Sequence, residues 1–178
     1  MLFLNILLIL LILLMQKSRK ILITGAAGFI GSNFIHYYME RYPDDFVTVL
    51  DKLTYAGNLD NLSDLQPRPQ FHFVRGDIAD NAFVDELFSK ERFDTVVNFA
   101  AETHVDRSIE SPSIFVMTNI VGTHNLLEAS RMYEVARYHQ ISTDEVYGDL
   151  GEGSTNYFTE TTPLAPNCPY AASKAASD

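Results

Sequence analysis

The chain has 178 residues, 47% of them hydrophobic and 20% charged, so it can bury a core and fits one domain or part of a larger one. A formal net charge of -10 gives no electrostatic case for nucleic-acid binding. The single cysteine, Cys168, excludes an intrachain disulfide and a thiol-rich metal site; we predict no metal and expect a reducing, cytoplasmic environment.

The first residues form an apolar extension that we separate from the fold. In MLFLNILLILLILLM only Asn5 is polar, and QKSRK follows with positive charges. The run is shorter than the roughly 20 residues that cross a bilayer, and it lacks the flanks of a secretory signal. Two interpretations stay open: a weak membrane anchor within residues 1–15, or an upstream extension with Met15 as the start. We expect residues 1–18 to lie outside a domain that covers 19–178.

From Lys20 onward, short apolar runs that predict buried strands alternate with longer helical patterns. The expected strands are KILIT (20–24), FVTVLD (46–51), FHFVRGD (71–77), TVVNFA (95–100) and RYHQIST (137–143). The expected helices are 29–40, with Phe29, Ile30, Phe34 and Tyr37 near one face, then 81–90, 114–133 and a last helix from Ala171. This alternation predicts an α/β protein with a doubly wound parallel sheet covered on both faces.

The carboxyl ends of these strands should meet at one edge of the sheet, where such sheets bind ligands. At this edge we expect Gly25, Asp51, Asp77, Ala100 and Thr143. In ITGAAGFIG the glycines at 25, 28 and 31 would tighten the turn and let a pyrophosphate reach the amides of the next helix. The alternative to dinucleotide binding is a turn between strand and helix that needs glycine only for packing.

Asp51 strengthens the dinucleotide interpretation. It ends the second strand 20 positions after Gly31, about where a carboxylate binds the adenosine ribose. A carboxylate there would repel a 2′-phosphate, so we predict NAD rather than NADP, although the adjacent Lys52 would soften the repulsion. Asp77 is expected either at the adenine edge or as a helix N-cap.

Tyr170 and Lys174 in PYAASK lie four residues apart, and so on one face of the last helix. A free phenol has a pKa near 10. A nearby ammonium, together with a positive nicotinamide ring, would favour the phenolate. That phenolate would take the proton of a sugar hydroxyl as its carbon gives hydride to NAD.

The stretch STDEVYG ends the fifth strand on two adjacent acids, Asp144 and Glu145. They form either a solvated loop or a pair of carboxylates aimed at a substrate. Because adjacent residues of an extended segment point opposite ways, both acids can face one ligand only if the chain turns here.

Taken together, DKLTYAGNL, AAETHVDRSI, TNIVGTHNLLEA, ISTDEVYGDL and YAASKAASD resemble the extended short-chain dehydrogenase/reductase (NAD-dependent epimerase/dehydratase) family over residues 19–178. The resemblance implies a Rossmann fold, a homodimer, and 4,6-dehydration of dTDP-glucose with NAD: oxidation at C4, loss of water across C5 and C6, and hydride return to C6. It also implies a further substrate domain, without which this chain would be an inactive fragment. The alternatives are a 4-epimerase, which lacks the acid doublet, and a non-catalytic NAD-binding fragment.

The resemblance also assigns roles. Glu145 would remove the C5 proton, Asp144 would protonate the departing hydroxyl, and Thr143 would bind the C4 oxygen. Thr103 would contact the sugar or the nicotinamide side. The catalytic set is thus Thr143, Asp144, Glu145, Tyr170 and Lys174. The cofactor set is Gly25, Ala27, Gly28, Phe29, Ile30, Gly31, Asp51, Lys52, Leu53, Thr54, Asp77, Ile78, Ala100, Ala101, Thr103, Thr118, Tyr170 and Lys174. Arg107 would serve the diphosphate or pair with Asp106.

Overall fold

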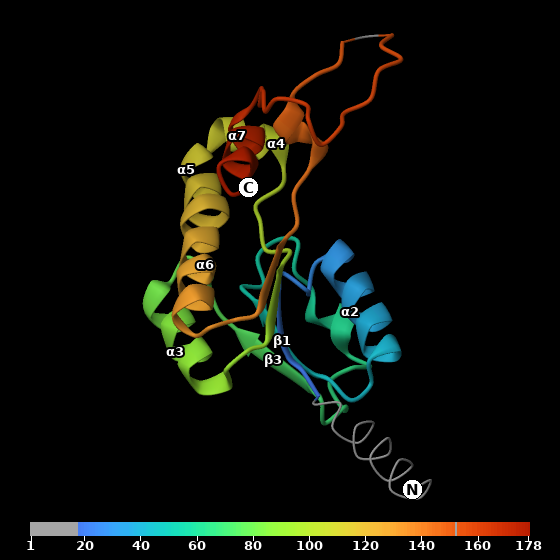
Figure 1. The fold of residues 1–178 in the computed structure, drawn as a ribbon, viewed down its shortest axis with the longest axis vertical. Helices are drawn as coiled ribbons and strands as arrows, with labels where there is room; N and C mark the ends of the chain where they lie inside the picture. The colour runs from blue at the N-terminus through green and yellow to red at the C-terminus, as the bar shows by residue number, and fades with distance from the viewer. Residues whose placement is uncertain (1–17, 152) are drawn as a thin grey trace, which may run out of the picture.

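The computed structural model describes residues 18–151 and 153–178 (Figure 1). Five strands form one parallel sheet in the order β3-β2-β1-β4-β5. Their bounds are β1 Lys20–Thr24, β2 Phe46–Asp51, β3 Phe71–Arg75, β4 Thr95–Asn98 and β5 Arg137–Gln140. The predicted extension at 1–18 lies, apart from residue 18, outside the described residues. Among those described, no helix is both long and apolar enough to cross a membrane.

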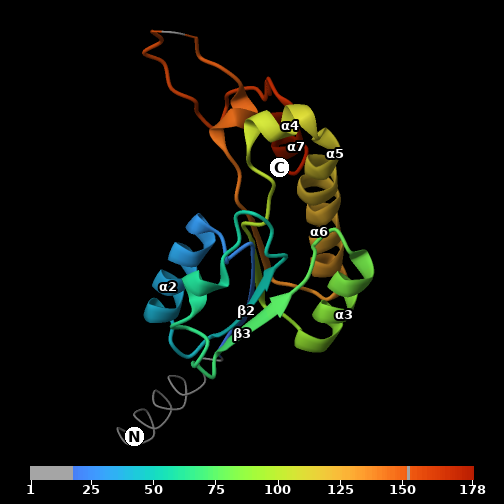
Figure 2. The same cartoon turned by 180° about the vertical axis from the view of Figure 1, so that it is seen from behind.

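Helices cover both faces of the sheet, as the alternating pattern predicts. Helix α2 (Phe29–Arg41) lies on one side, and α3 (Asn81–Glu91) and α6 (Thr123–Met132) lie on the other (Figures 1 and 2). Two separate apolar clusters fill the two interfaces, one around Ile23 and Ile35 and the other around Leu22 and Phe88. This order of parallel strands between two helical layers is the doubly wound Rossmann architecture.

Three strands end earlier than predicted. The sequence suggested 71–77, 95–100 and 137–143, whereas β3, β4 and β5 stop at Arg75, Asn98 and Gln140. After each of these strands, the next residue makes one further backbone hydrogen bond to the neighbouring strand, such as Phe99 N–H to the Thr24 carbonyl at 3.1 Å. The backbone then leaves the sheet because the neighbouring strand ends at the same level. These departing segments form the edge at which the candidate site lies.

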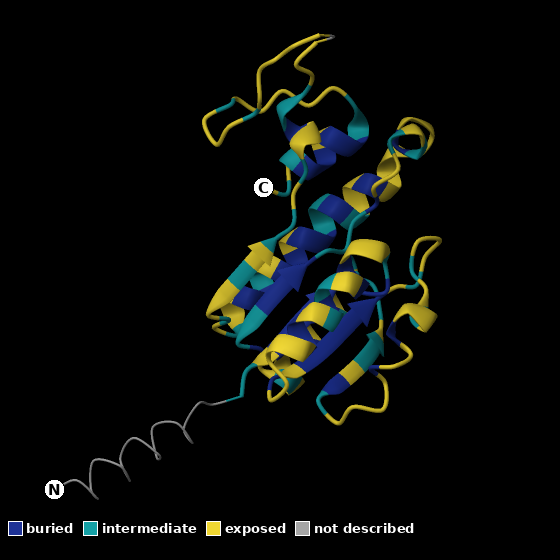
Figure 3. Ribbon diagram, turned by 90° about the vertical axis from the view of Figure 1, so that its right-hand side faces the viewer, coloured by how far each residue is buried: buried dark blue, intermediate teal, exposed yellow. Residues whose placement is uncertain are grey.

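The apolar face predicted for α2 is mostly wrong, because of its four residues only Phe34 packs against a buried cluster. Phe29 is 82% exposed and Tyr37 65% exposed, and the side buried against the sheet carries Gly31, Ile35 and Met39 (Figure 3). The reason is contact at the start of the helix: a Cβ on Gly31 would come within 2.6 Å of the Gly25 carbonyl oxygen. The face that contains Gly31 is therefore the one that can approach the turn and the sheet.

The long helix predicted at 114–133 is divided. It consists of α5 (Pro112–Phe115), a π-helical segment η2 (Val116–Gly122) and α6. Three short elements were not predicted: η1 (Leu59–Leu62), α4 (Val105–Glu110) and η3 (Asp144–Tyr147). The last helix, α7, runs from Pro169 to Ala175 and packs against α4, α5 and η3. It is therefore anchored over the carboxyl edge of the sheet.

Candidate functional site

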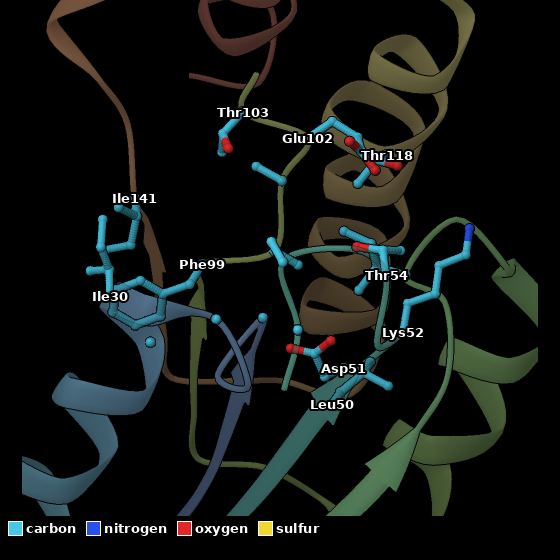
Figure 4. A pocket seen from close by; sticks show the side chains of 18 of the residues that line it. Ile30, Leu50, Asp51, Lys52, Thr54, Phe99, Glu102, Thr103, Thr118 and Ile141 are labelled. Atoms are coloured by element: carbon cyan, nitrogen blue, oxygen red, sulfur yellow. The ribbon is translucent and has the colours of Figure 1, made fainter. Parts of the chain in front are cut away.

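A cleft of ≈ 370 Å³ opens at the carboxyl ends of the strands (Figure 4). Its walls come from the turn after β1, the ends of β2 to β5, the π segment and α7. Of the predicted cofactor residues, sixteen line it: Gly25, Gly28, Phe29, Ile30, Gly31, Asp51, Lys52, Thr54, Asp77, Ile78, Ala100, Ala101, Thr103, Thr118, Tyr170 and Lys174. Ala27 and Leu53 are not among its lining residues.

The turn after β1 requires glycine at its first position. Gly25 has a φ of +68°, and a Cβ there would lie 2.5 Å from the Ala100 backbone nitrogen. The ends of β1 and β4 can therefore approach closely only with glycine at this position. Helix α2 begins immediately afterwards, with Gly28 as its N-cap, so its first backbone N–H groups lie at the cleft.

Asp51 is 9% exposed and both of its carboxylate oxygens accept backbone hydrogen bonds. Oδ2 accepts from Ala27 N–H at 3.0 Å, and Oδ1 accepts from Leu53 N–H at 2.8 Å. Ala27 and Leu53 thus act on the site by orienting this carboxylate rather than by lining the cleft. Since each carboxylate oxygen has a second lone pair, Asp51 can still accept from a ligand hydroxyl.

Asp77 and Lys52 form an ion pair between the ends of β3 and β2. The distance from Lys52 Nζ to Asp77 Oδ2 is 2.6 Å, and Asp77 Oδ1 accepts from Ala79 N–H at 2.9 Å. The N-cap of α3 is Asp80, which accepts from Phe83 N–H. The N-cap alternative for Asp77 is therefore wrong.

Tyr170 and Lys174 lie on one side of α7 and are 8% and 4% exposed. Cys168 is the N-cap of this helix, with its Sγ accepting from Ala171 N–H. The Lys174 ammonium donates to the Ile141 carbonyl oxygen at 2.5 Å. Both residues line the cleft, at the opposite end from Lys52.

In the chain alone, the pKa values of this pair reflect its burial. Burial raises the pKa of the Tyr170 phenol above its usual value, the Thr143 hydroxyl opposes that change, and the negative charge of Glu145 adds to it. Burial also lowers the pKa of the Lys174 ammonium. The prediction of a phenolate combines Lys174 with the positive nicotinamide ring, whose charge would oppose the effect of burial on Tyr170.

The two acids of STDEVYG lie on the short helix η3, so the chain does turn at this point, which is the condition for both acids to face one ligand. Thr143 is its N-cap, and its hydroxyl accepts from Glu145 N–H at 3.4 Å. Asp144 and Glu145 are exposed, and with Thr143 they lie beside the cleft rather than among its lining residues. Because α7 packs against η3, both acids are close enough to Tyr170 to raise its pKa.

A buried amide connects the walls of the cleft. Asn119, in the π segment, accepts from Glu102 N–H at 2.8 Å and donates to the Glu102 carbonyl at 2.9 Å. It also donates to Ser173 Oγ at 2.8 Å, and Ser173 donates to the Tyr170 carbonyl. The segment after β4, the long helix and α7 are thus held in one arrangement, which fixes where the Tyr170 ring enters the cleft.

Sequence reasoning missed several lining residues. Most of them follow or end a strand, where the strand-end rule would have found them: Leu50, Ala56, Gly57, Gly76, Phe99, Ile141 and Ser142. Glu102 is different: it is buried beside Thr118 (Figure 4), and its Oε2 has no hydrogen-bond partner among the described residues.

Of the two roles predicted for Arg107, the pair with Asp106 is not seen among the described residues, and the diphosphate role stays a prediction. Its guanidinium lies 4.1 Å from the centre of the Tyr55 ring. The described residues show no ion pair between Arg107 and Asp106, and Arg107 is not among the residues lining the cleft.

The fold and the cleft define a Rossmann-type α/β protein. The chain belongs to the family described as GDP-mannose 4,6 dehydratase, whose model matches residues 22–178. It is 53% identical over 169 residues to the dTDP-glucose 4,6-dehydratase of Neisseria meningitidis serogroup B, with 90% of this chain and 47% of that protein covered. The chain spans about half the length of the curated relatives it matches.

Solved structures agree with this assignment. A dTDP-glucose 4,6-dehydratase from Streptomyces venezuelae, crystallised with NAD bound, has a TM-score of 0.81 and 48% identity, with 89% of this chain and 49% of that chain covered. A UDP-Glc/GlcNAc 4-epimerase from Campylobacter jejuni has a TM-score of 0.80 but 38% identity, with 90% and 47% covered. The resemblance inferred from the motifs is confirmed, and the epimerase is the more distant relative.

Proposed function

We propose that residues 19–178 form the NAD-binding, catalytic part of a dTDP-glucose 4,6-dehydratase. The observation that supports the proposal is that one cleft contains both residues suited to bind a dinucleotide and a tyrosine–lysine pair suited to proton transfer. Asp51 and the glycine turn lie at one end, and Tyr170 and Lys174 lie at the other. The Asp144–Glu145 turn packs beside Tyr170, at the end where a sugar would react.

The residues at the first end fit a dinucleotide. A Cβ on Gly25 or Gly31 would meet backbone within 2.6 Å, so these glycines create the close approach that a pyrophosphate needs. The N–H groups of α2 suit its charge, and Asp51 is oriented for ribose hydroxyls. Asp77 at the adenine edge and Thr118 on the facing helix complete the proposed binding set. Bound NAD would accept and return a hydride in the reaction.

At the other end the side chains divide the proton transfers. Tyr170 takes the proton of the C4 hydroxyl, with Thr143 binding the same oxygen and Lys174 supporting the phenolate. Once C4 is a ketone the C5 proton is acidic, and Glu145 removes it. Asp144 gives a proton to the departing C6 hydroxyl, which leaves as water. The exposure of both acids in this chain matches a role on a substrate that is covered by other residues.

The test is incubation of dTDP-glucose with the protein as its source cell makes it, followed by mass spectrometry of the sugar. The dehydratase proposal expects loss of one water, with the mass of the nucleotide unchanged. A product of unchanged mass but inverted C4 would support the 4-epimerase instead. Binding of NAD with no change in the mass or the C4 configuration of dTDP-glucose would leave the non-catalytic alternative. We also propose a homodimer, which sedimentation of the same protein would test.

A further inference from the structure

The ion pair between Lys52 and Asp77 has no part in the reaction proposed above. It spans the ends of β2 and β3 at 2.6 Å, and both residues line the cleft. The Lys52 side chain is 55% exposed, so it is free to take other positions, whereas an exposed pair of this kind is worth little to stability. Its position therefore suggests an effect on ligand choice.

The position of Lys52 is the one at which a cation matters for the adenosine ribose. In Rossmann folds a carboxylate after β2 binds the 2′-hydroxyl, and a basic side chain nearby accommodates a 2′-phosphate. Both kinds of residue are adjacent here. Of the two lysines that line the cleft, Lys174 is bonded to the Ile141 carbonyl at the far end. Among the lining residues, only Lys52 can thus neutralise a 2′-phosphate.

The two neighbours differ in mobility. Asp51 is held by two backbone N–H groups and is buried, so it cannot turn away from a 2′-phosphate. Lys52 has a long side chain and, among the described residues, one ion-pair partner, the Asp77 carboxylate. A 2′-phosphate would have to take Lys52 away from that carboxylate while facing Asp51.

We propose that Asp77 is a specificity-determining residue that selects NAD over NADP by occupying the ammonium of Lys52. The inference rests on the proposed function and extends it: Asp51 supplies the repulsion, and Asp77 removes the cation that would offset it. Asp77→Asn is a suitable change because an amide oxygen can still accept from Ala79 N–H and keep the local turn.

The test is titration of the nucleotide-free full chain with NAD and with NADP at fixed ionic strength, for four proteins: the original, Asp77→Asn, Lys52→Gln and the double variant. The readout is the ratio of the dissociation constants of NADP and NAD. Any contact of Asp77 with adenine is common to both ligands and cancels in this ratio. Asp77→Asn should lower the ratio by about fivefold while Lys52 is present, and clearly less in the Lys52→Gln background.

The outcomes distinguish a failure of the inference about Asp77 from a failure of the proposed function. An unchanged ratio in Asp77→Asn would overturn the inference. The inference would also be overturned if Asp77→Asn lowered the ratio equally with Lys52 and with Lys52→Gln, because Asp77 would then act by long-range repulsion alone. If the original chain binds neither nucleotide, the proposed function fails, and the inference fails with it. NAD binding with a ratio that depends on Lys52 supports both.

Discussion

The two ends of the cleft differ in what holds their key groups. At the end proposed for adenosine, the Asp51 carboxylate is oriented by the backbone N–H groups of Ala27 and Leu53. At the end proposed for catalysis, Tyr170 and Lys174 depend on α7, which is connected to the rest of the cleft through the side chains of Asn119 and Ser173.

Burial affects the second end as well. It raises the pKa of Tyr170 and lowers the pKa of Lys174. The comparison teaches that the first end is organised for its ligand in the chain itself. The second end has its groups in place, and a positive charge on the ligand would favour the phenolate that burial opposes. We therefore expect cofactor binding to help form the phenolate.

Replacing Tyr170 with phenylalanine should have the largest effect. Without the phenol, oxidation at C4 should slow by about 10²- to 10⁴-fold, while NAD affinity changes little because the adenosine end is untouched. Single-turnover absorbance of reduced nicotinamide with dTDP-glucose measures this step. Tyr147→Phe is the matched control, since Tyr147, the last residue of η3, stacks on Phe158. Full oxidation by Tyr170→Phe would remove the phenol from the mechanism.

Glu145→Gln should separate the two halves of the reaction. The first hydride transfer continues, but the C5 proton is no longer removed, so product formation should fall by about 100-fold and reduced nicotinamide should accumulate. Rapid-quench analysis of the sugar, together with absorbance, measures both steps. Glu160→Gln, on the exposed segment after η3, is the control. An unchanged rate of water loss would assign the base elsewhere.

Asp51→Asn tests the end of the cleft at which backbone N–H groups orient the Asp51 carboxylate. Both carboxylate oxygens of Asp51 accept from backbone N–H groups, so the amide group of asparagine must turn its own N–H toward one of them. The lost hydrogen bond should cost about 1–3 kcal/mol of stability. NAD binding should weaken by about tenfold. Thermal unfolding and NAD titration give the two values, and Asp60→Asn in η1 is an exposed control. Loss of affinity with no loss of stability would contradict the view that Asp51 also holds the turn.

Thr143→Val should have the smallest effect, seen in the pH profile. The Thr143 hydroxyl lowers the pKa of Tyr170, so its removal raises that pKa further. Because the reactive form is the phenolate, the rising limb of the oxidation rate should move to higher pH, and the rate at neutral pH should fall by up to about tenfold. Thr143→Ser keeps the hydroxyl and should keep the profile. An unmoved limb in Thr143→Val would show that the hydroxyl acts only on the substrate.

The sequence predicted the sheet, its helices and most of the cleft because those features follow local patterns. Apolar runs, the glycine spacing and Asp51 at a strand end are each visible within a few residues. The exposed Phe29, the π segment and the partner of Lys52 were not predictable in the same way. The exposure of Phe29 depends on how closely Gly31 approaches the turn at Gly25, and the partner of Lys52 depends on two strand ends that are distant in sequence. We find no local pattern that marks the π segment. The altered pKa values likewise come from burial, which no motif records.

The π segment at 116–122 gives the long helix an unusual tolerance to a change in length. A π turn holds more residues than an α turn, so it takes up an extra residue within one turn and leaves the flanking helices facing nearly the same way. Deleting one residue between Val116 and Gly122 should therefore restore an α turn and keep Phe115, now 1% exposed, on its buried side. A deletion within α6 would instead rotate one part of the helix against the other by roughly 100°. The π segment is thus the place where this helix can change in length, as long as Asn119 still reaches Ser173.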